Sequence, residues 1–238
     1  MDRLPHTLTA TEIEDIEKMS MRITTQALLN FAANAWDEFR NSPDDADGVA
    51  EDVTQEALTD LSGFPIRQRL YGTVDYRQAR YIFLPEYQLR QALFVDSKAE
   101  KSASSGRIQI GQSSLRVLFT RGDGTVVDTQ GGLSPVISLP NGNSYLTTTQ
   151  FVHYHYTESG AGRVLRAILV AALPNGILES NYVTSPTDHI WNVGPDSPAR
   201  GEKQRARLSF TKLAQKVTWR VQRIRFDQEG QVTFSWEE

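Results

Sequence analysis

The chain has no cysteine among its 238 residues. Without thiols it can form neither a disulfide nor a thiolate metal site, and this composition suits the reducing cytoplasm where we expect the protein to reside. Long apolar runs are also missing, because no segment approaches the roughly 18 residues that cross a bilayer. The polar residues 1–5 do not have the pattern of a signal peptide. We therefore expect no membrane among its partners.

An excess of positive charge is missing as well. The chain has 25 Lys and Arg against 29 Asp and Glu, a formal net charge of −4. A balance of this kind disfavours nucleic-acid binding, since phosphates are neutralised by Lys and Arg. The two signs are separated along the chain, however, with acids gathered in residues 41–60 and the densest basic stretch in residues 200–207. The net charge therefore does not exclude a nucleic-acid partner.

Helices and strands alternate along a chain of ordinary globular composition, with 39% hydrophobic and 23% charged residues. We expect one domain over residues 1–238. Apolar residues at three- and four-residue steps predict a long amphipathic helix over residues 11–39, with Thr11 as its N-cap and Glu14 completing a capping box. A second helix is predicted over residues 49–61. Residues 145–157 alternate like a strand, and the apolar residues 164–173 predict a central strand of a mixed sheet.

Asp96 and Lys98 follow four consecutive apolar residues, 92–95, which predict a short buried strand. Positions i and i+2 of a strand share a face, so the carboxylate and the ammonium group emerge side by side at the end of that strand. A carboxylate can bind a divalent cation, and a neighbouring lysine can orient or deprotonate a water molecule. The alternative is a solvated ion pair, because Asp-x-Lys is common by chance.

Asp75 ends another β-like run, residues 71–76, about twenty residues before Asp96. Two adjacent strands that each end in Asp can place both carboxylates on one metal ion. The resulting D…DxK pattern is the sparse signature of PD-(D/E)xK nucleases, with Val74 here in place of the proline. Glu51 lies in the N-terminal half of the second predicted helix, and its role has two interpretations. Either the helix dipole simply favours a negative charge there, or Glu51 faces the aspartate pair and binds the metal directly or through water.

Basic residues mark two strands near the end of the chain. Arg200, Lys203, Arg205 and Arg207 form the densest basic stretch, and Arg220 begins a second basic strand over residues 219–226. Such strands are usually solvated edges of a sheet. Beside a nuclease signature they become candidates for contacts with DNA phosphates and bases.

The chain resembles the SfiI-type restriction endonucleases. The matching segments are residues 50–55, 72–76, 95–99 and 151–153, then Ser197-Pro-Ala-Arg200-Gly-Glu202 with its continuation to Phe210, and finally Trp219 and Arg220. They occur in the same order along essentially the whole chain, and agreement is weakest in residues 100–145. The Ser-Pro-Ala-Arg-Gly-Glu segment is far more specific than D…DxK.

This resemblance implies a PD-(D/E)xK fold of the α/β (α+β) class, in which a central mixed β-sheet is flanked by helices. Residues 11–40 would form the N-terminal helix, residues 67–100 the catalytic strands and residues 197–226 the DNA-reading strands. It also implies a prokaryotic type II restriction endonuclease that cleaves double-stranded DNA with Mg²⁺ at an interrupted palindrome such as GGCCNNNNNGGCC. A homotetramer is expected, with a dimer as the minimum for a palindromic site.

Residue by residue, the resemblance makes Asp75 and Asp96 metal ligands, together with the carbonyl of Ser97, and makes Lys98 the catalytic lysine. Arg205 and Arg207 match positions that read guanine, which suits the bidentate reach of arginine to O6 and N7. Two alternatives stay open. One is a structure-directed repair or junction nuclease, and the other is a non-catalytic DNA-binding module, which the intact Asp75, Asp96 and Lys98 disfavour.

Overall fold

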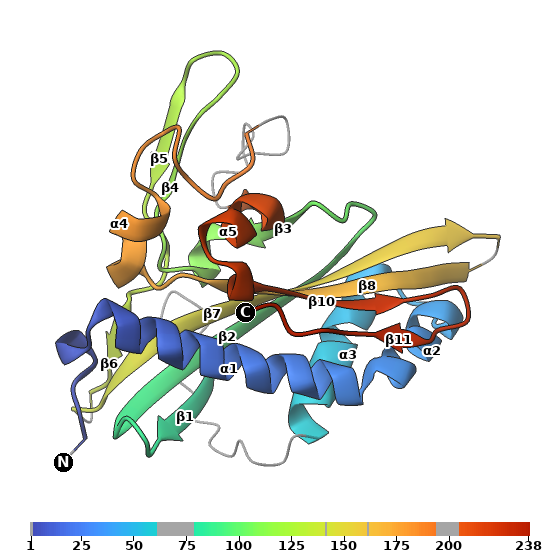
Figure 1. Ribbon diagram of the computed structural model, residues 1–238, viewed down its shortest axis with the longest axis horizontal. Coiled ribbons are helices and arrows are strands. Elements are labelled where there is room, and N and C mark those ends of the chain that lie inside the picture. Colours follow the sequence, from blue (N-terminus) through green and yellow to red (C-terminus); the bar gives the residue numbers. More distant parts are fainter. Residues whose placement is uncertain (1, 61–78, 141, 161, 194–204) are drawn as a thin grey trace.

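A seven-stranded mixed sheet forms the centre of the computed structural model, which describes residues 2–60, 79–140, 142–160, 162–193 and 205–238 (Figure 1). Its strands follow the order β1-β2-β7-β8-β10-β11, and β6 pairs with β7. The strands are β1 (Arg80–Leu84), β2 (Leu89–Glu100), β6 (Val136–Ser138), β7 (Ser144–Ser159), β8 (Gly162–Leu173), β10 (Val221–Phe226) and β11 (Val232–Thr233). This arrangement confirms the expected fold class.

Strands β2 and β7 run parallel, and the other strand pairs of this sheet are antiparallel. The strand predicted at residues 145–157 is β7, and the apolar run at residues 164–173 lies in β8, between β7 and β10. Strand β8 is thus inside the sheet, as its apolar composition predicts. Of the catalytic strands expected over residues 67–100, residues 67–78 lie outside the described residues, and the described part contains β1 paired with β2.

Two layers cover the sheet. Helices α1 (Ala10–Asn30), α2 (Ala32–Asn41) and α3 (Ala46–Asp60) pack against a face that includes Val152, Tyr154 and Ile168. The other face, with Phe151 and Leu169, is covered by smaller elements. Those smaller elements include β3 (Ser105–Gln109) paired with β9 (Arg205–Ser209), η3 (Ile110–Gln112), β4 (Val117–Thr120) paired with β5 (Val126–Thr129), η4 (Gly176–Leu178), α4 (Glu179–Tyr182), α5 (Phe210–Lys216) and η5 (Thr218–Arg220). None of the described helices is long and apolar enough to cross a membrane.

The N-terminal helical segment differs from its prediction in two ways. The N-cap is Thr9, whose hydroxyl accepts from the Glu12 N–H at 3.3 Å while Glu12 Oε2 accepts from the Thr9 N–H at 2.8 Å. The box at Thr11 and Glu14 was therefore the wrong one of two overlapping Thr-x-x-Glu patterns. Arg3 stabilises the capping box at Thr9 and Glu12, because it forms an ion pair with Glu12. The predicted single helix is also divided at Phe31 into α1 and α2.

Candidate active site

Strand β2 carries the Asp-x-Lys pair within the strand and not at its end. The predicted strand stopped at residue 95, but parallel pairing with β7 continues to Glu100, opposite His155. Asp96 and Lys98 lie in register with Phe151 and His153, while Val95 and Ala99 pack toward the helices. Alternation thus places the carboxylate and the ammonium group on the face turned away from the helical layer.

Helix α3 lies along the edge of β2 that carries this pair. Strand β1 pairs with β2 only as far as Leu93, so among the described strands residues 94–100 have a partner only on the β7 side. Asp47 Oδ1 accepts the backbone N–H of Ala99 at 2.8 Å. Glu51 stands four residues further along α3, on the same side of the helix, where it reaches Lys98.

Glu51, Lys98 and Asp96 form a chain of charges. Lys98 Nζ lies 3.2 Å from Glu51 Oε1 and 4.0 Å from Asp96 Oδ1. The side chain of Asp96 is 11% exposed, whereas that of Glu51 is 62% exposed. The structure therefore brings together three of the residues singled out in the sequence. Glu51 therefore faces the site and contacts Lys98, in addition to any stabilisation that it receives from the helix dipole.

Gln112, at the end of η3, holds the buried carboxylate. In the amide orientation that satisfies its neighbours, its Nε2 donates to both oxygens of Asp96, each at 3.2 Å. Thr149 Oγ1 in turn donates to the backbone carbonyl of Gln112 at 2.9 Å. Contacts from η3 therefore fix the direction of the Asp96 side chain. The hydrogen bond from Thr149 in turn holds η3 against β7.

Burial raises the pKa of Asp96 to about 6, since Lys98 and the Gln112 hydrogen bond only partly offset the loss of solvation and the repulsion from Glu51 and Asp47. For Lys98, burial lowers the pKa, but the carboxylates of Asp96 and Glu51 outweigh it and leave the pKa above its usual value. At neutral pH the lysine is thus protonated beside a carboxylate that lacks full compensation. Such a site favours an additional cation.

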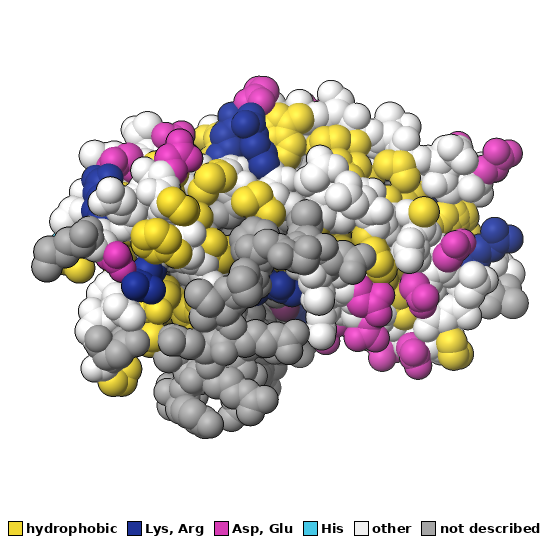
Figure 2. Space-filling view, turned by 90° about the horizontal axis from the view of Figure 1, so that it is seen from below, with side chains coloured by type: hydrophobic (Ala, Val, Ile, Leu, Met, Phe, Trp, Pro, Cys, Tyr) yellow, Lys and Arg dark blue, Asp and Glu magenta, His cyan; other side chains and the backbone are white. Residues whose placement is uncertain are grey.

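Acidic side chains gather on part of the face seen in Figure 2. The exposed acids of α3 are Asp47, Glu51, Asp52 and Glu56. A concentration of negative charge near Asp96 attracts cations and repels anions. Within the described part of the chain, no three His, Cys, Asp or Glu side chains form a cluster that could hold a metal. Asp75, the expected second aspartate, lies outside the described residues.

Of the basic residues expected to contact DNA, Arg200 and Lys203 also lie outside the described residues. Arg205 and Arg207 are on β9, which pairs with β3 so that Arg205 stands opposite Gln109 and Arg207 opposite Arg107. The side chain of Arg207 is 10% exposed, and its Nη1 donates to Glu100 Oε2 at 2.9 Å. The structure thus brings Arg207 to β2, two residues beyond Lys98.

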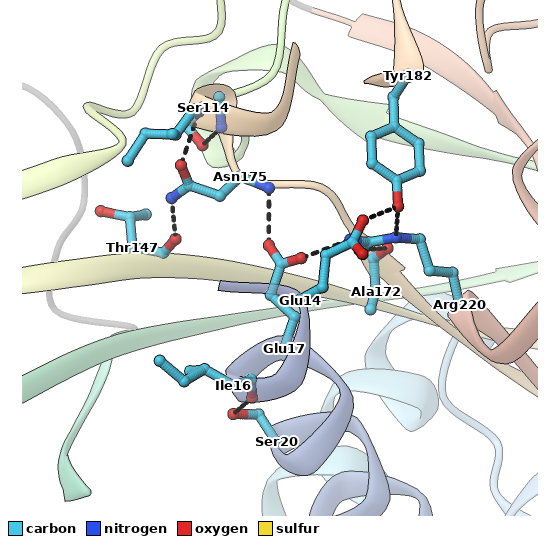
Figure 3. A network of polar contacts seen from close by, with 12 residues as sticks. Glu14, Ile16, Glu17, Ser20, Ser114, Thr147, Ala172, Asn175, Tyr182 and Arg220 are labelled. Carbon is cyan, nitrogen blue, oxygen red and sulfur yellow. Dashed lines mark hydrogen bonds and ion pairs between the residues drawn. The ribbon is translucent and has the colours of Figure 1, made fainter. Parts of the chain in front are cut away.

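Arg220 is buried inside the protein, which argues against the DNA contact expected for this residue. Its side chain has no exposed surface, and its Nη2 lies 2.7 Å from Glu17 Oε2 in a buried network with Tyr182 and Glu14 (Figure 3). Its guanidinium also lies 4.5 Å from the ring centroid of Trp219. The alternating basic pattern of residues 219–226 is typical of a sheet edge, but β10 begins at Val221 and lies between β8 and β11, and Arg220 belongs to η5, which precedes it.

Comparison with known proteins identifies the family. A family model described as "Type II restriction enzyme SfiI" matches residues 12–224. The type II restriction enzyme SfiI of Streptomyces fimbriatus is 32% identical to this protein over 95% of this chain and 89% of its own length. The chain belongs to the SfiI family of type II restriction enzymes.

Solved structures agree with this membership of the SfiI family. The crystal structure of tetrameric SfiI bound to cognate DNA superposes with a TM-score of 0.86, at 31% identity, over 99% of this chain and 93% of that chain. The restriction endonuclease BglI bound to its recognition sequence gives a TM-score of 0.71 at 15% identity, over 91% of both chains. The second likeness concerns the fold alone.

Three contributors to this site of an SfiI-family chain escaped the sequence analysis: Asp47, Glu100 and Gln112. Asp47 had a usable signal, because it stands four residues before Glu51 on a predicted helix and so shares its face. Glu100 continues the alternation of Asp96 and Lys98. A strand predicted to end at residue 95 does not include Glu100, whereas β2 extends to it. Gln112 gives no signal, since its contact with Asp96 depends on how η3 folds over the sheet.

Proposed function

We propose that this protein cleaves double-stranded DNA at a specific GC-rich, interrupted palindrome of the GGCCNNNNNGGCC kind, by Mg²⁺-dependent hydrolysis of the phosphodiester bond. The supporting observation is that Asp96, Lys98 and Glu51 converge at the edge of β2 in a chain of the SfiI family. Contacts with Asp47, Gln112 and each other hold these three side chains or the segments that carry them.

The donor set fits a hard divalent cation. The carboxylate of Asp96 is buried and only partly compensated, Glu51 supplies a second carboxylate nearby, and all of these donors are oxygen atoms. Asp75 and the backbone carbonyl of Ser97 are the further ligands that we assign. When bound, Mg²⁺ supplies Lewis-acid stabilisation of charge on the scissile phosphate and on the departing oxygen.

The residues of the chain then have separate tasks. Lys98 keeps its proton, directs the attacking water by hydrogen bonding and places a positive charge beside the phosphate. Glu51 fixes the Lys98 ammonium group from α3, and Gln112 keeps the Asp96 carboxylate turned toward the site. Because both supports come from elements packed on the sheet, the geometry is preorganised.

Recognition is assigned to the basic residues before and in β9. Arg205 and Arg207 read guanine in the major groove, and Arg200 and Lys203 contact phosphates or bases. A palindrome presents the same half-site twice, so two protomers related by a two-fold axis are required. The solved relative is a tetramer bound to cognate DNA, and we assign the same assembly here.

The decisive experiment uses long unmodified DNA, incubated with the purified protein and Mg²⁺, and the ends of the fragments are sequenced. We expect every end to carry the same short GC-rich palindrome and the Asp96→Ala variant to produce no fragments. Ends at branched or damaged positions without a shared sequence would favour a structure-directed nuclease. Specific binding without any cleavage would favour a non-catalytic DNA-binding module.

A further inference from the structure

Glu100 follows Asp96 and Lys98 on one face of β2, at successive two-residue steps. Its carboxylate joins the catalytic strand to both strands of the β3–β9 pair. Oε2 accepts from Arg207 Nη1 on β9 at 2.9 Å, and Oε1 accepts from the backbone N–H of Arg107 on β3 at 3.1 Å. One side chain therefore holds an arginine assigned to base reading and the strand beside it.

Contacts around Arg207 restrict the orientation of its guanidinium group. Besides Glu100, Nη1 lies 3.2 Å from Ser105 Oγ and 3.4 Å from the Ser105 carbonyl oxygen. Glu100 is the only acidic residue that forms an ion pair with Arg207 in the part of the chain that the structure describes. A charge-assisted hydrogen bond to a planar guanidinium constrains its orientation more strongly than a neutral one does.

The β3–β9 pair is also held close to the sheet. Gly106, next to Arg107, lies so near β7 that a Cβ atom built on it would be 2.3 Å from Phe151 Cε1 and 3.0 Å from His153 Nδ1. Only glycine permits this approach without displacing an aromatic ring. As a result, the Glu100 carboxylate on β2 and the Arg207 guanidinium on β9 are brought within hydrogen-bonding distance.

We propose that Glu100 is a positioning residue that presents Arg207 to the DNA bases and couples that contact to the catalytic strand. This inference rests on the proposed function, because it assigns the sequence specificity of the same nuclease. A bidentate contact with guanine requires the arginine fork in one orientation. A carboxylate behind the fork provides that orientation, and it also repels DNA phosphates that approach without the matching base.

Two effects on binding follow from this geometry. Replacing the carboxylate by an amide loosens Arg207, so affinity for the correct site falls. The same replacement removes a negative charge near the DNA, so affinity for unrelated DNA rises. The first change lowers the discrimination at the base that Arg207 reads, whereas the second acts on all sequences alike and cancels in that ratio. Asp96 and Lys98 keep their own contacts.

The test measures binding in Ca²⁺ at fixed salt, for the duplex identified by fragment-end sequencing and for duplexes with one G·C pair changed. Wild type, Glu100→Gln, Arg207→Ala and the double variant form a cycle. We expect Glu100→Gln to lower the discrimination ratio at the G·C pair that Arg207 reads by about tenfold. In the Arg207→Ala background the same change should lower it no further, because Glu100 acts through Arg207.

Glu158→Gln is the matched control. It removes the same charge from an exposed side chain of β7 that forms an ion pair with Lys101, and it should leave the ratio unchanged. Glu100→Asp retains the charge but is one methylene too short for both contacts, so it serves as the second variant should Glu100→Gln fail to fold. Thermal melting of each variant separates loss of folding from loss of specificity.

Three results overturn the inference: an unchanged ratio in Glu100→Gln and Glu100→Asp, an equal fall in Glu158→Gln, or an equal fall with and without Arg207. In each of them wild type still discriminates, so the proposed function stands. If the wild-type protein binds all sequences with equal affinity, that result contradicts both the proposed function and this inference.

Discussion

Arg220 and Glu17 form an ion pair inside the protein, with 2.7 Å between Nη2 and Oε2 and with side-chain exposures of 0% and 2%. Glu17 also accepts the backbone N–H of Asn175 at 2.7 Å, so it ties α1 both to η5 and to the segment after β8. Burial raises the pKa of Glu17, and the nearby Arg220 opposes that rise. Each charge is tolerated in the interior because the other is present.

Arg220→Ala should therefore destabilise the protein and should not change base discrimination. Removing the guanidinium leaves Glu17 buried without its cation, and breaking such a pair costs about 3–5 kcal/mol. Arg225→Ala, at an exposed position of β10 five residues further along the chain, is the control and should stay within about 0.5 kcal/mol of wild type. Urea denaturation at equal protein concentration measures both. Equal stability of the two variants, with DNA affinity lost in Arg220→Ala, would restore the DNA-contact role.

Asp96→Asn should stabilise the metal-free protein above pH 6. The carboxyl has a pKa of about 6 in the folded protein against an ordinary value of 3.8, so it binds its proton more tightly when folded. Raising the pH through this interval therefore costs folding free energy, and the amide escapes that cost. From about 1.4 kcal/mol for each pKa unit, the gain is on the order of 2–3 kcal/mol at pH 8 and falls to about 0.5 kcal/mol near pH 4. Melting curves at both pH values, without metal, measure it; an equal gain at pH 4 would contradict the electrostatic origin.

The same variant should bind DNA more tightly than wild type in EDTA. Without a cation the carboxylate of Asp96, together with Asp47 and Glu51, repels the phosphate, and the amide removes one of these charges. Gel-shift titration with the cognate duplex measures the difference. Lys98→Gln is the contrasting variant: it removes a positive charge and should weaken binding in EDTA. Weaker binding by Asp96→Asn would show that the carboxylate does not face the DNA backbone.

The sequence pattern located Asp96 and Lys98 correctly because strand alternation is a local property of the backbone. It left two readings for Glu51, which only the packing of α3 along β2 could decide. The buried position of Arg220 could not be predicted, because it depends on a contact that is distant in sequence. Its compensating acid, Glu17, is 203 residues away in sequence, and nothing near Arg220 indicates that the charge is buried. Thr9 and Thr11 likewise present the same capping pattern, and Arg3 selects the first.

Two-site DNA should be cut faster than one-site DNA. In a tetramer with two DNA clefts, binding of the first duplex orders the assembly and so favours binding of the second. Adding a short duplex that carries the site should therefore accelerate cleavage of a supercoiled plasmid with one site at low enzyme concentration. Light scattering should give about four times the chain mass of 26.7 kDa. A dimer mass without stimulation would contradict two-site action and leave the nuclease assignment intact.

The most direct test of the central claim compares cleavage by Lys98→Ala and Lys101→Ala. Lys101 lies three residues further along the chain and pairs with the exposed Glu158, so the two variants lose the same charge in the same region. Single-turnover rates are measured on cognate DNA in Mg²⁺, with binding checked in Ca²⁺. We predict that Lys98→Ala binds the site but cuts it at least about a hundredfold more slowly, while Lys101→Ala cuts at the wild-type rate. Cleavage by Lys98→Ala at a rate close to that of Lys101→Ala would contradict the assigned active site.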